Sequence, residues 1–246
     1  MDQQQEISTQ PPKKITTNHS SPDNSSSLSF GEGRGEALKI ARYNFNDCLS
    51  FLEKNGKSMF GEHFAINQED HPVIFKLMVY FFKDKSHAEN LGISFRKGIL
   101  LTGPVGCGKT SLMTLMRAFL HPDEQHIMKP CRDVSFEFIQ EGYGTIHKYS
   151  KESFHQRSGE TTPKRYCFDD LGVEQNLKYY GNECNVMAEV LLSRYDLFIS
   201  RNMLTHITTN LSATEIETMY GNRIRSRMRE MFNLVAFNQK TSDKRV

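Results

Sequence analysis

The residues that could most clearly do chemistry lie in the segment GPVGCGKT, at positions 103–110. This segment matches the pattern G-x-x-x-x-G-K-[ST], in which glycines let the backbone turn tightly and point successive N–H groups at phosphate oxygens. Lys109 would reach the β- and γ-phosphates of a nucleoside triphosphate, and the Thr110 hydroxyl would hold Mg²⁺. The helical segment that follows would present its positive end to the same anion. The predicted nucleotide-binding residues are Gly103, Pro104, Val105, Gly106, Cys107, Gly108, Lys109, Thr110 and Ser111.

A pair of acidic residues is the second chemical feature. The apolar segment 166–168 predicts a short strand that delivers Asp169 and Asp170 at its carboxyl end, where open α/β sheets bind ligands. One carboxylate there can hold Mg²⁺ while a second orients the attacking water, and we assign Asp169 to the metal and Asp170 to the water. An Asp-Asp-Leu-Gly turn on its own is as often ordinary loop structure. The phosphate loop upstream favours the interpretation as a site.

A polar amide follows the next predicted strand, at 203–208. Asn210 closes this strand, and its side chain could hydrogen-bond the γ-phosphate or the lytic water. The alternative is that Asn210 caps the next helix, since Asn is favoured at helix starts. Ser212 and Glu215 already have the spacing of a capping box, so the cap does not require Asn210.

Arginines occupy alternate positions in the segment YGNRIRSRMREMF, from Arg223 to Arg229. In a helix, Arg223 and Arg227 would share one face. An arginine near a γ-phosphate stabilises the charge of phosphoryl transfer, and it can be donated by a neighbouring subunit. A solvated basic helix face carries equal weight as the alternative.

The elements that must position these residues follow from the spacing of apolar residues. The predicted helices cover 35–57, 72–83, 139–150, 183–199 and 213–230, and the predicted strands cover 98–101, 134–138, 165–168, 203–208 and 234–237. Strands that alternate with helices indicate an α/β fold with a mostly parallel central sheet flanked by helices.

Composition limits the classes of protein that fit. A chain of 246 residues suggests one or two domains, and a net charge of +2 excludes a globally basic or acidic protein. Five cysteines without a C-x-x-C pair fit a reduced protein better than a disulfide scaffold or zinc site. No apolar run approaches the roughly 20 residues that span a bilayer, and no signal sequence precedes the polar start. We therefore expect a cytoplasmic protein without a membrane association.

The motifs taken in order resemble a known family. The phosphate loop, FDDLG, a strand ending in Thr-Asn and YGNRIRSRM together are similar to AAA+ ATPases of the DnaC/IstB type, which are helicase loaders and transposition helpers. The similarity covers residues 70 to 240 and implies a P-loop NTPase with ATP and Mg²⁺ as ligands. It places Asn210 at the sensor 1 position and Arg227 at the arginine finger, with Arg223 as a nearby candidate. Because a finger acts across an interface, the resemblance also implies an oligomer.

The resemblance also implies how the chain is divided. We expect a disordered tail at 1–35, a short helical region at 36–69 and an AAA+ ATPase domain at 70–246. The short remainder after the last predicted strand leads us to expect no C-terminal lid domain, and so no sensor 2 arginine. A docking tail is the alternative for 1–35.

Partners are less well defined by the residues. The family implies a replicative helicase or a transposase, and single-stranded DNA is a further candidate. Lys178 lies beside Tyr179 and Tyr180, and loops of this kind can stack bases. Basic residues at 148, 151 and 157 add to this, although packing tyrosines and a solvated helix face are the more common outcomes.

Two other function classes are the alternatives to an ATPase of this type. A small-molecule P-loop phosphotransferase would need lid arginines on an insertion, and none is evident between the core motifs. A nucleotide-dependent binding module with little hydrolysis would not need the set formed by Lys109, Asp169, Asp170 and Asn210. An ATPase that acts like a helicase loader is the preferred prediction.

Overall fold

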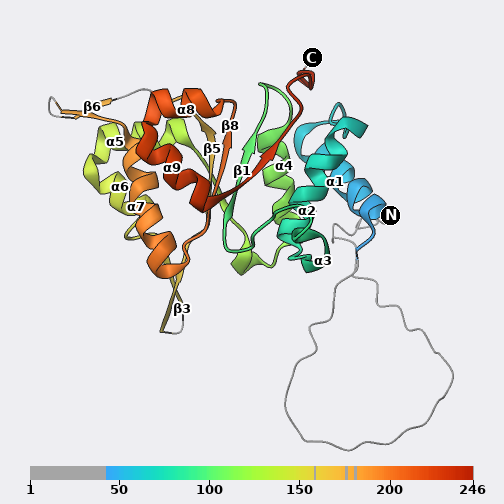
Figure 1. Cartoon of the computed structure of the whole chain (residues 1–246), viewed down its shortest axis with the longest axis horizontal. Helices are drawn as coiled ribbons and strands as arrows, with labels where there is room; N and C mark the ends of the chain where they lie inside the picture. Colours follow the sequence, from blue (N-terminus) through green and yellow to red (C-terminus); the bar gives the residue numbers. More distant parts are fainter. Residues whose placement is uncertain (1–42, 158, 175–176, 180–181, 246) are drawn as a thin grey trace, which may run out of the picture.

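The computed structural model describes residues 43–157, 159–174, 177–179 and 182–245. The predicted tail at 1–35 and the first residues of the predicted 36–69 region lie outside this range. The described chain forms a five-stranded parallel sheet with helices on both faces (Figure 1), which confirms the predicted α/β class. No helix in these ranges has both the length and the apolar character that crossing a membrane requires.

The central sheet has its strands in an order that differs from their order in the chain. Its strands are β1 (Gly98–Thr102), β2 (Ile127–Pro130), β5 (Tyr166–Leu171), β8 (Thr205–Thr209) and β9 (Phe232–Ala236). They are arranged β2-β5-β8-β1-β9, and every neighbouring pair is parallel. Strand β1 therefore lies between two strands that come much later in the chain. All five carboxyl ends point to one edge, where ligands bind in open α/β sheets.

The helices and two small hairpins surround this sheet. The helices are α1 (Phe45–Phe60), α2 (His71–Phe81), α3 (Lys85–Ala88), α4 (Lys109–Met116), α5 (Cys131–Glu141), α6 (Tyr143–Tyr149), α7 (Val186–Arg201), α8 (Ala213–Tyr220) and α9 (Asn222–Met231). Short 3₁₀ turns cover Gln68–Asp70, Arg117–Phe119 and Pro122–Glu124. The hairpins are β3 (Phe154–Arg157) with β4 (Glu160–Pro163), and β6 (Leu177–Tyr179) with β7 (Asn182–Cys184).

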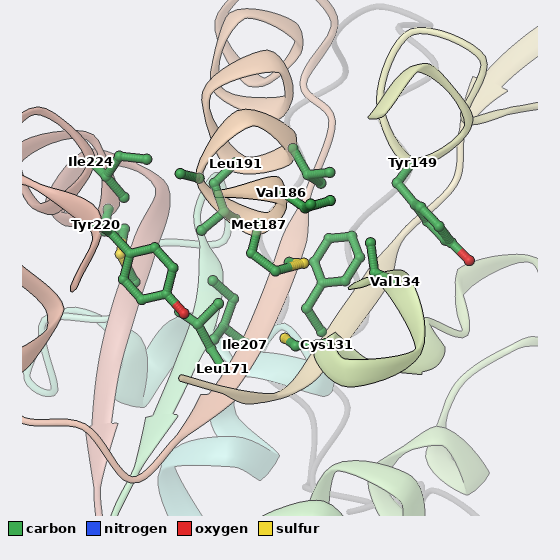
Figure 2. Packing of buried hydrophobic residues seen from close by; sticks show 14 of the residues in the cluster. Cys131, Val134, Tyr149, Leu171, Val186, Met187, Leu191, Ile207, Tyr220 and Ile224 are labelled. Carbon is green, nitrogen blue, oxygen red and sulfur yellow. The ribbon is translucent and has the colours of Figure 1, made fainter. Parts of the chain in front are cut away.

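Two hydrophobic cores hold the layers together. Helices α1, α2 and α4 pack on one face of the sheet, against strand residues such as Ile99 and Leu101. Helices α5 to α9 pack on the other face, where Figure 2 shows Leu171 and Ile207 among residues from α5, α7 and α8. Strands β1, β5 and β9 each supply residues to both cores, because successive side chains of a β-strand point to opposite faces. Strand β1, which leads into the phosphate loop, is thus covered by helices on both faces of the sheet.

One predicted strand, at 134–138, is wrong, because this segment lies within helix α5. Apolar residues alternate there, and that alternation favoured a strand. In the structure Cys131, Val134 and Phe138 are buried at spacings of three and four, while Phe136 is 55% exposed. The second strand of the sheet is instead β2, whose sequence IMKP lacks a strong strand pattern. Its proline is tolerated because β2 lies at the sheet edge.

The predicted helix at 213–230 is two helices. Gly221 separates α8 from α9 with a φ of 85°, a conformation that residues with side chains rarely adopt. The predicted capping box at the start of α8 is confirmed, since Ser212 and Glu215 each accept the other's backbone N–H. The turn at Gly221 redirects α9 so that it packs against α7.

Candidate nucleotide site

The phosphate loop connects β1 to α4 and has the backbone shape that its glycines allow. Gly106 and Gly108 have φ values of 77° and 95°, in the left-handed region that favours glycine. Lys109 begins α4 and is 6% exposed, and its ammonium group donates to the carbonyl oxygens of Gly103 at 3.0 Å and Pro104 at 2.8 Å. The first N–H groups of α4 lack partners within the helix. The loop therefore presents backbone donors and a cation at one place.

A hydroxyl–carboxylate network links the loop to β5 and β8. The Thr110 hydroxyl lies 3.0 Å from each carboxylate oxygen of Asp169 and donates to this group. The Thr208 hydroxyl donates to Asp169 at 2.6 Å and accepts the N–H of Asp170 at 2.9 Å. Asp169 is 7% exposed, and burial raises the pKa of its carboxyl although the Thr208 and Thr110 hydroxyls act in the opposite direction. Its negative charge is thus incompletely compensated, which favours a nearby cation.

The oxygens of Thr110 and Asp169 satisfy the requirements of Mg²⁺. This ion prefers hard oxygen ligands and usually takes one or two carboxylates together with phosphate and water. A hydroxyl and a buried carboxylate beside the phosphate loop supply such ligands. The described residues contain no group of three or more His, Cys, Asp or Glu side chains that could hold a metal ion without a nucleotide. A magnesium ion at this position would therefore depend on phosphate oxygens.

An irregularity in β5 brings both acidic residues to the same edge. The register between β5 and β8 shifts in the segment Phe168–Leu171, and Asp170 has a φ of 54°. Such a bulge re-aims side chains that would otherwise point to opposite faces. Asp169 reaches the α4 side, whereas Asp170 lines the cavity. Behind this turn, the buried carboxylate of Glu174 accepts the hydroxyl of Tyr220 on α8.

A cavity of about 620 Å³ lies beside the loop, a size typical of small-molecule sites. Its phosphate side is formed by Val105, Gly106, Gly108, Lys109, Thr110, Ser111, Asp170, Val173 and Asn210. We call its second side the 60–67 wall, formed by Phe60, His63, Phe64, Ala65 and Asn67. We call its third side the 242–245 wall, formed by Ser242, Asp243, Lys244 and Arg245. The cavity thus combines apolar surface on one side with cations on the others.

The predicted arginines lie elsewhere. Arg227 is on α9, where its guanidinium group lies 4.5 Å from the centre of the Tyr195 ring and 3.9 Å from the carboxylate of Asp196. Arg223 is exposed on the same helix. Neither residue lines the cavity, whereas Asn210 does. The structure therefore groups Asn210 with the phosphate loop and leaves both arginines outside the site of their own chain.

The basic and aromatic residues predicted to touch nucleic acid are only partly described. Tyr180 lies outside the described residues, while Lys178 and Tyr179 belong to β6, which pairs with β7. Lys148 forms ion pairs with Glu137 at 2.9 Å and with a second glutamate on α5. Its charge is thus locally compensated, and DNA binding stays a prediction.

Three parts of the site were missed by the sequence analysis. Thr208 was recognised only as a strand residue, although its place near the end of β8, beside the acidic pair of β5, was a usable signal. The 60–67 wall and the 242–245 wall had no sequence signal, because they flank the predicted motifs at large distances along the chain. Their contribution depends on the three-dimensional fold.

Comparisons with known proteins found partial similarities only. No family model matches the chain. It is 33% identical over 78 residues to the ATP-dependent zinc metalloprotease FtsH 2 of Petrotoga mobilis, which covers 32% of this chain and 12% of that protein. It is 26% identical over 113 residues to ABC transporter B family member 1 of Arabidopsis thaliana, which covers 46% of this chain and 7% of that protein. The chain thus spans a small fraction of both relatives.

Solved structures of similar shape include the DnaC helicase loader, at 17% identity and a TM-score of 0.48, covering 71% of this chain and 93% of that chain. DnaI is similar at 17% identity and a TM-score of 0.45, with 71% and 88% coverage. AMPPCP-bound DnaA from Aquifex aeolicus is similar at 17% identity and a TM-score of 0.44, with 74% and 50% coverage.

Proposed function

We propose that this chain binds ATP together with Mg²⁺ and hydrolyses it to ADP and phosphate. The observation that carries the proposal is the single cavity that Lys109, Thr110, Asp170 and Asn210 share. A nucleoside triphosphate needs backbone donors and a lysine for its phosphates, hard oxygens for its metal ion and a polar group for the attacking water. Each of these groups borders the cavity or contacts a residue that does.

Phosphate binding would use groups that are already oriented. The Lys109 ammonium group would exchange the carbonyl oxygens of Gly103 and Pro104 for phosphate oxygens, with little movement of its buried stem. The N–H groups from Gly106 to Thr110 and the positive end of α4 would face the same charge. Binding therefore requires an exchange of partners rather than a new fold.

Hydrolysis would divide the two carboxylates between two tasks. Thr110 and Asp169 would hold Mg²⁺, which supplies charge stabilisation at the phosphates when bound. Asp170 lines the cavity and would orient the attacking water, with Asn210 as a second polar contact to the water or the γ-phosphate. The Thr208 hydroxyl would keep both acidic residues in place through its two hydrogen bonds.

The arginine finger in this proposal comes from a second copy of the chain. Arg227, with Arg223 one turn away on α9, would reach the nucleotide of a neighbouring subunit in an oligomer. The likeness to helicase loaders supports a role in loading a replicative helicase, with a transposase as the alternative partner. Single-stranded DNA is a further candidate ligand through Lys178 and the neighbouring tyrosines.

The test of the core proposal is direct. Purified protein is expected to bind ATP with Mg²⁺ and to release phosphate, and Lys109→Ala should lose about 100-fold or more of this turnover. Lys54→Ala is the matched control, because Lys54 is exposed on α1 and does not line the cavity. Equal turnover in the two variants would show that the phosphate loop takes no part in ATP hydrolysis. Rapid phosphate transfer to a nucleotide or sugar would instead support a phosphotransferase.

A further inference from the structure

The last described residues return to the phosphate loop. The backbone N–H of Lys244 donates to the carbonyl oxygen of Gly106 at 3.1 Å. Gly106 permits this approach, because a Cβ atom there would lie 1.9 Å from a carboxylate oxygen of Asp243. Figure 1 shows the chain after β9 running past the edge of the sheet, toward the side of the sheet that α1 and α2 cover. The 242–245 wall is therefore in contact with the loop itself.

A buried ion pair holds this wall from the other side. The Lys244 ammonium group pairs with the carboxylate of Asp70, which is only 1% exposed. The same carboxylate oxygen accepts the backbone N–H of Asn67 at 2.9 Å, at the end of the 60–67 wall. Asp70 thus connects two walls of the cavity. A charge buried this deeply is tolerated only with partners, which gives the connection a defined geometry.

The wall also carries a cation at the cavity. Asp243 accepts the backbone N–H of Arg245 at 3.0 Å, which stabilises the turn between them. Arg245 is exposed and lines the same cavity as Lys109. A triphosphate carries several negative charges, and guanidinium groups bind phosphate oxygens in a bidentate manner. The position of Arg245 is thus suited to a phosphorylated ligand.

We propose that the 242–245 wall is part of the nucleotide site, in which Arg245 contacts the phosphates. Asp70 and Lys244 are positioning residues that hold this wall and the 60–67 wall around the bound nucleotide. The inference rests on the proposed ATP binding and extends it to residues outside the recognised motifs. A purely structural pair would stabilise the fold without changing affinity for phosphates, and this difference can be measured.

The experiment compares the affinity for ATP, ADP and AMP in the full chain by calorimetry or with a fluorescent analogue. Arg245→Ala should weaken ATP binding about 10-fold, with a smaller effect on AMP, because charge-assisted hydrogen bonds to phosphate are lost. The KM for ATP should rise by a similar factor. Lys240→Ala is the control, as an exposed lysine in the same segment that does not line the cavity.

The ion pair is tested with variants that keep the fold. Lys244→Ala leaves the buried Asp70 without its cation and can unfold the chain. The double variant D70N/K244M removes both charges and should stay folded while its ATP affinity falls about 10-fold. Lys244→Arg keeps the positive charge beside Asp70 and should therefore retain most of the wild-type affinity for ATP.

Two results would overturn the proposal. Wild-type affinity in Arg245→Ala and in D70N/K244M would make the wall purely structural, and tighter binding would show that it obstructs the nucleotide. A loss of binding in Lys109→Ala, measured alongside, would show that the proposed ATP site still holds in either case. An absence of ATP binding in the wild-type protein would instead contradict the proposed function itself.

Discussion

The candidate nucleotide site at the carboxyl edge of the sheet, called the edge below, and helix α9 hold their polar residues in different ways. At the edge, the hydroxyls of Thr110 and Thr208 both donate to Asp169, and Lys109 donates to carbonyl oxygens of its own loop. On α9, Arg227 stacks on Tyr195, which belongs to the neighbouring helix of the same layer. The edge is an internal network, whereas the arginines lie on the periphery of the chain.

This difference indicates how each region can act. Groups in a network are oriented before a ligand arrives, and such preorganisation is the main source of electrostatic catalysis. The α9 arginines do not line the cavity of their own chain, so any effect on the nucleotide requires a second surface. The edge should therefore govern both binding and the chemistry within one chain, whereas the helix should affect turnover only through assembly.

The largest expected effect tests the helix. Arg227→Ala should lower ATP turnover about 1,000-fold, because an arginine finger contributes on this scale, while ATP affinity stays close to wild type. Turnover of the wild-type protein should rise more than linearly with protein concentration. Mixing Arg227→Ala with Lys109→Ala should restore activity, since each supplies what the other lacks at a shared site. Undiminished turnover in Arg227→Ala would place this arginine among surface residues.

A somewhat smaller effect tests the metal position at the edge. Asp169→Asn keeps an acceptor for the two threonine hydroxyls but removes the charge, and should lower turnover about 100-fold. Mg²⁺ should strengthen ATP binding in the wild-type protein and have little effect in the variant. Titration of ATP with and without EDTA measures this. An equal Mg²⁺ effect in both proteins would contradict the assignment of Asp169.

The network itself is tested by Thr208→Val, which preserves shape and removes two hydrogen bonds. The buried carboxylate of Asp169 loses a donor and the N–H of Asp170 loses an acceptor, so turnover should fall about 10-fold. Thr208→Ser should retain most of the activity. If valine and serine behave alike, the hydroxyl has no role in placing the acidic pair.

The smallest expected effect is on the stability of the sheet rather than on the site. His126 and His206 are buried beside Phe81, and burial lowers the pKa of His126 to about 4 and that of His206 well below its ordinary value. Both stay neutral in the fold but bind protons when unfolded, so stability is complete above pH 6.5 and is lost as pH falls toward 4. At pH 5.5 the loss should be about 1.4 kcal/mol for each histidine.

Denaturant titrations at pH 7.5 and 5.5 measure this loss. His126→Gln should remove about half of this pH dependence, because His206 keeps its share. Equal unfolding free energies at the two pH values would contradict the neutral burial of these rings.

The parts of the candidate site that could be predicted from the sequence are those that form short motifs. The glycine loop, the acidic pair and Asn210 could be found because each stands at the end of a strand, and a parallel sheet brings such ends together. The segment at 134–138 was misassigned because alternating apolar residues fit a strand as well as they fit one face of α5. The pair between Asp70 and Lys244 could not be predicted, because the partners are 174 positions apart and neither belongs to a motif.

The position of β1 within the sheet also has a consequence for synthesis of the chain. Leu100 pairs with Ile207 on one side and Leu234 on the other. On the ribosome the phosphate loop emerges long before either neighbouring strand, and contacts that are distant in sequence form slowly. The apolar β1 segment therefore stays unpaired until β8 and β9 have been synthesised. ATP bound as proposed would stabilise the fold only after β8 and β9 have been made, and would not guide the earlier steps of folding.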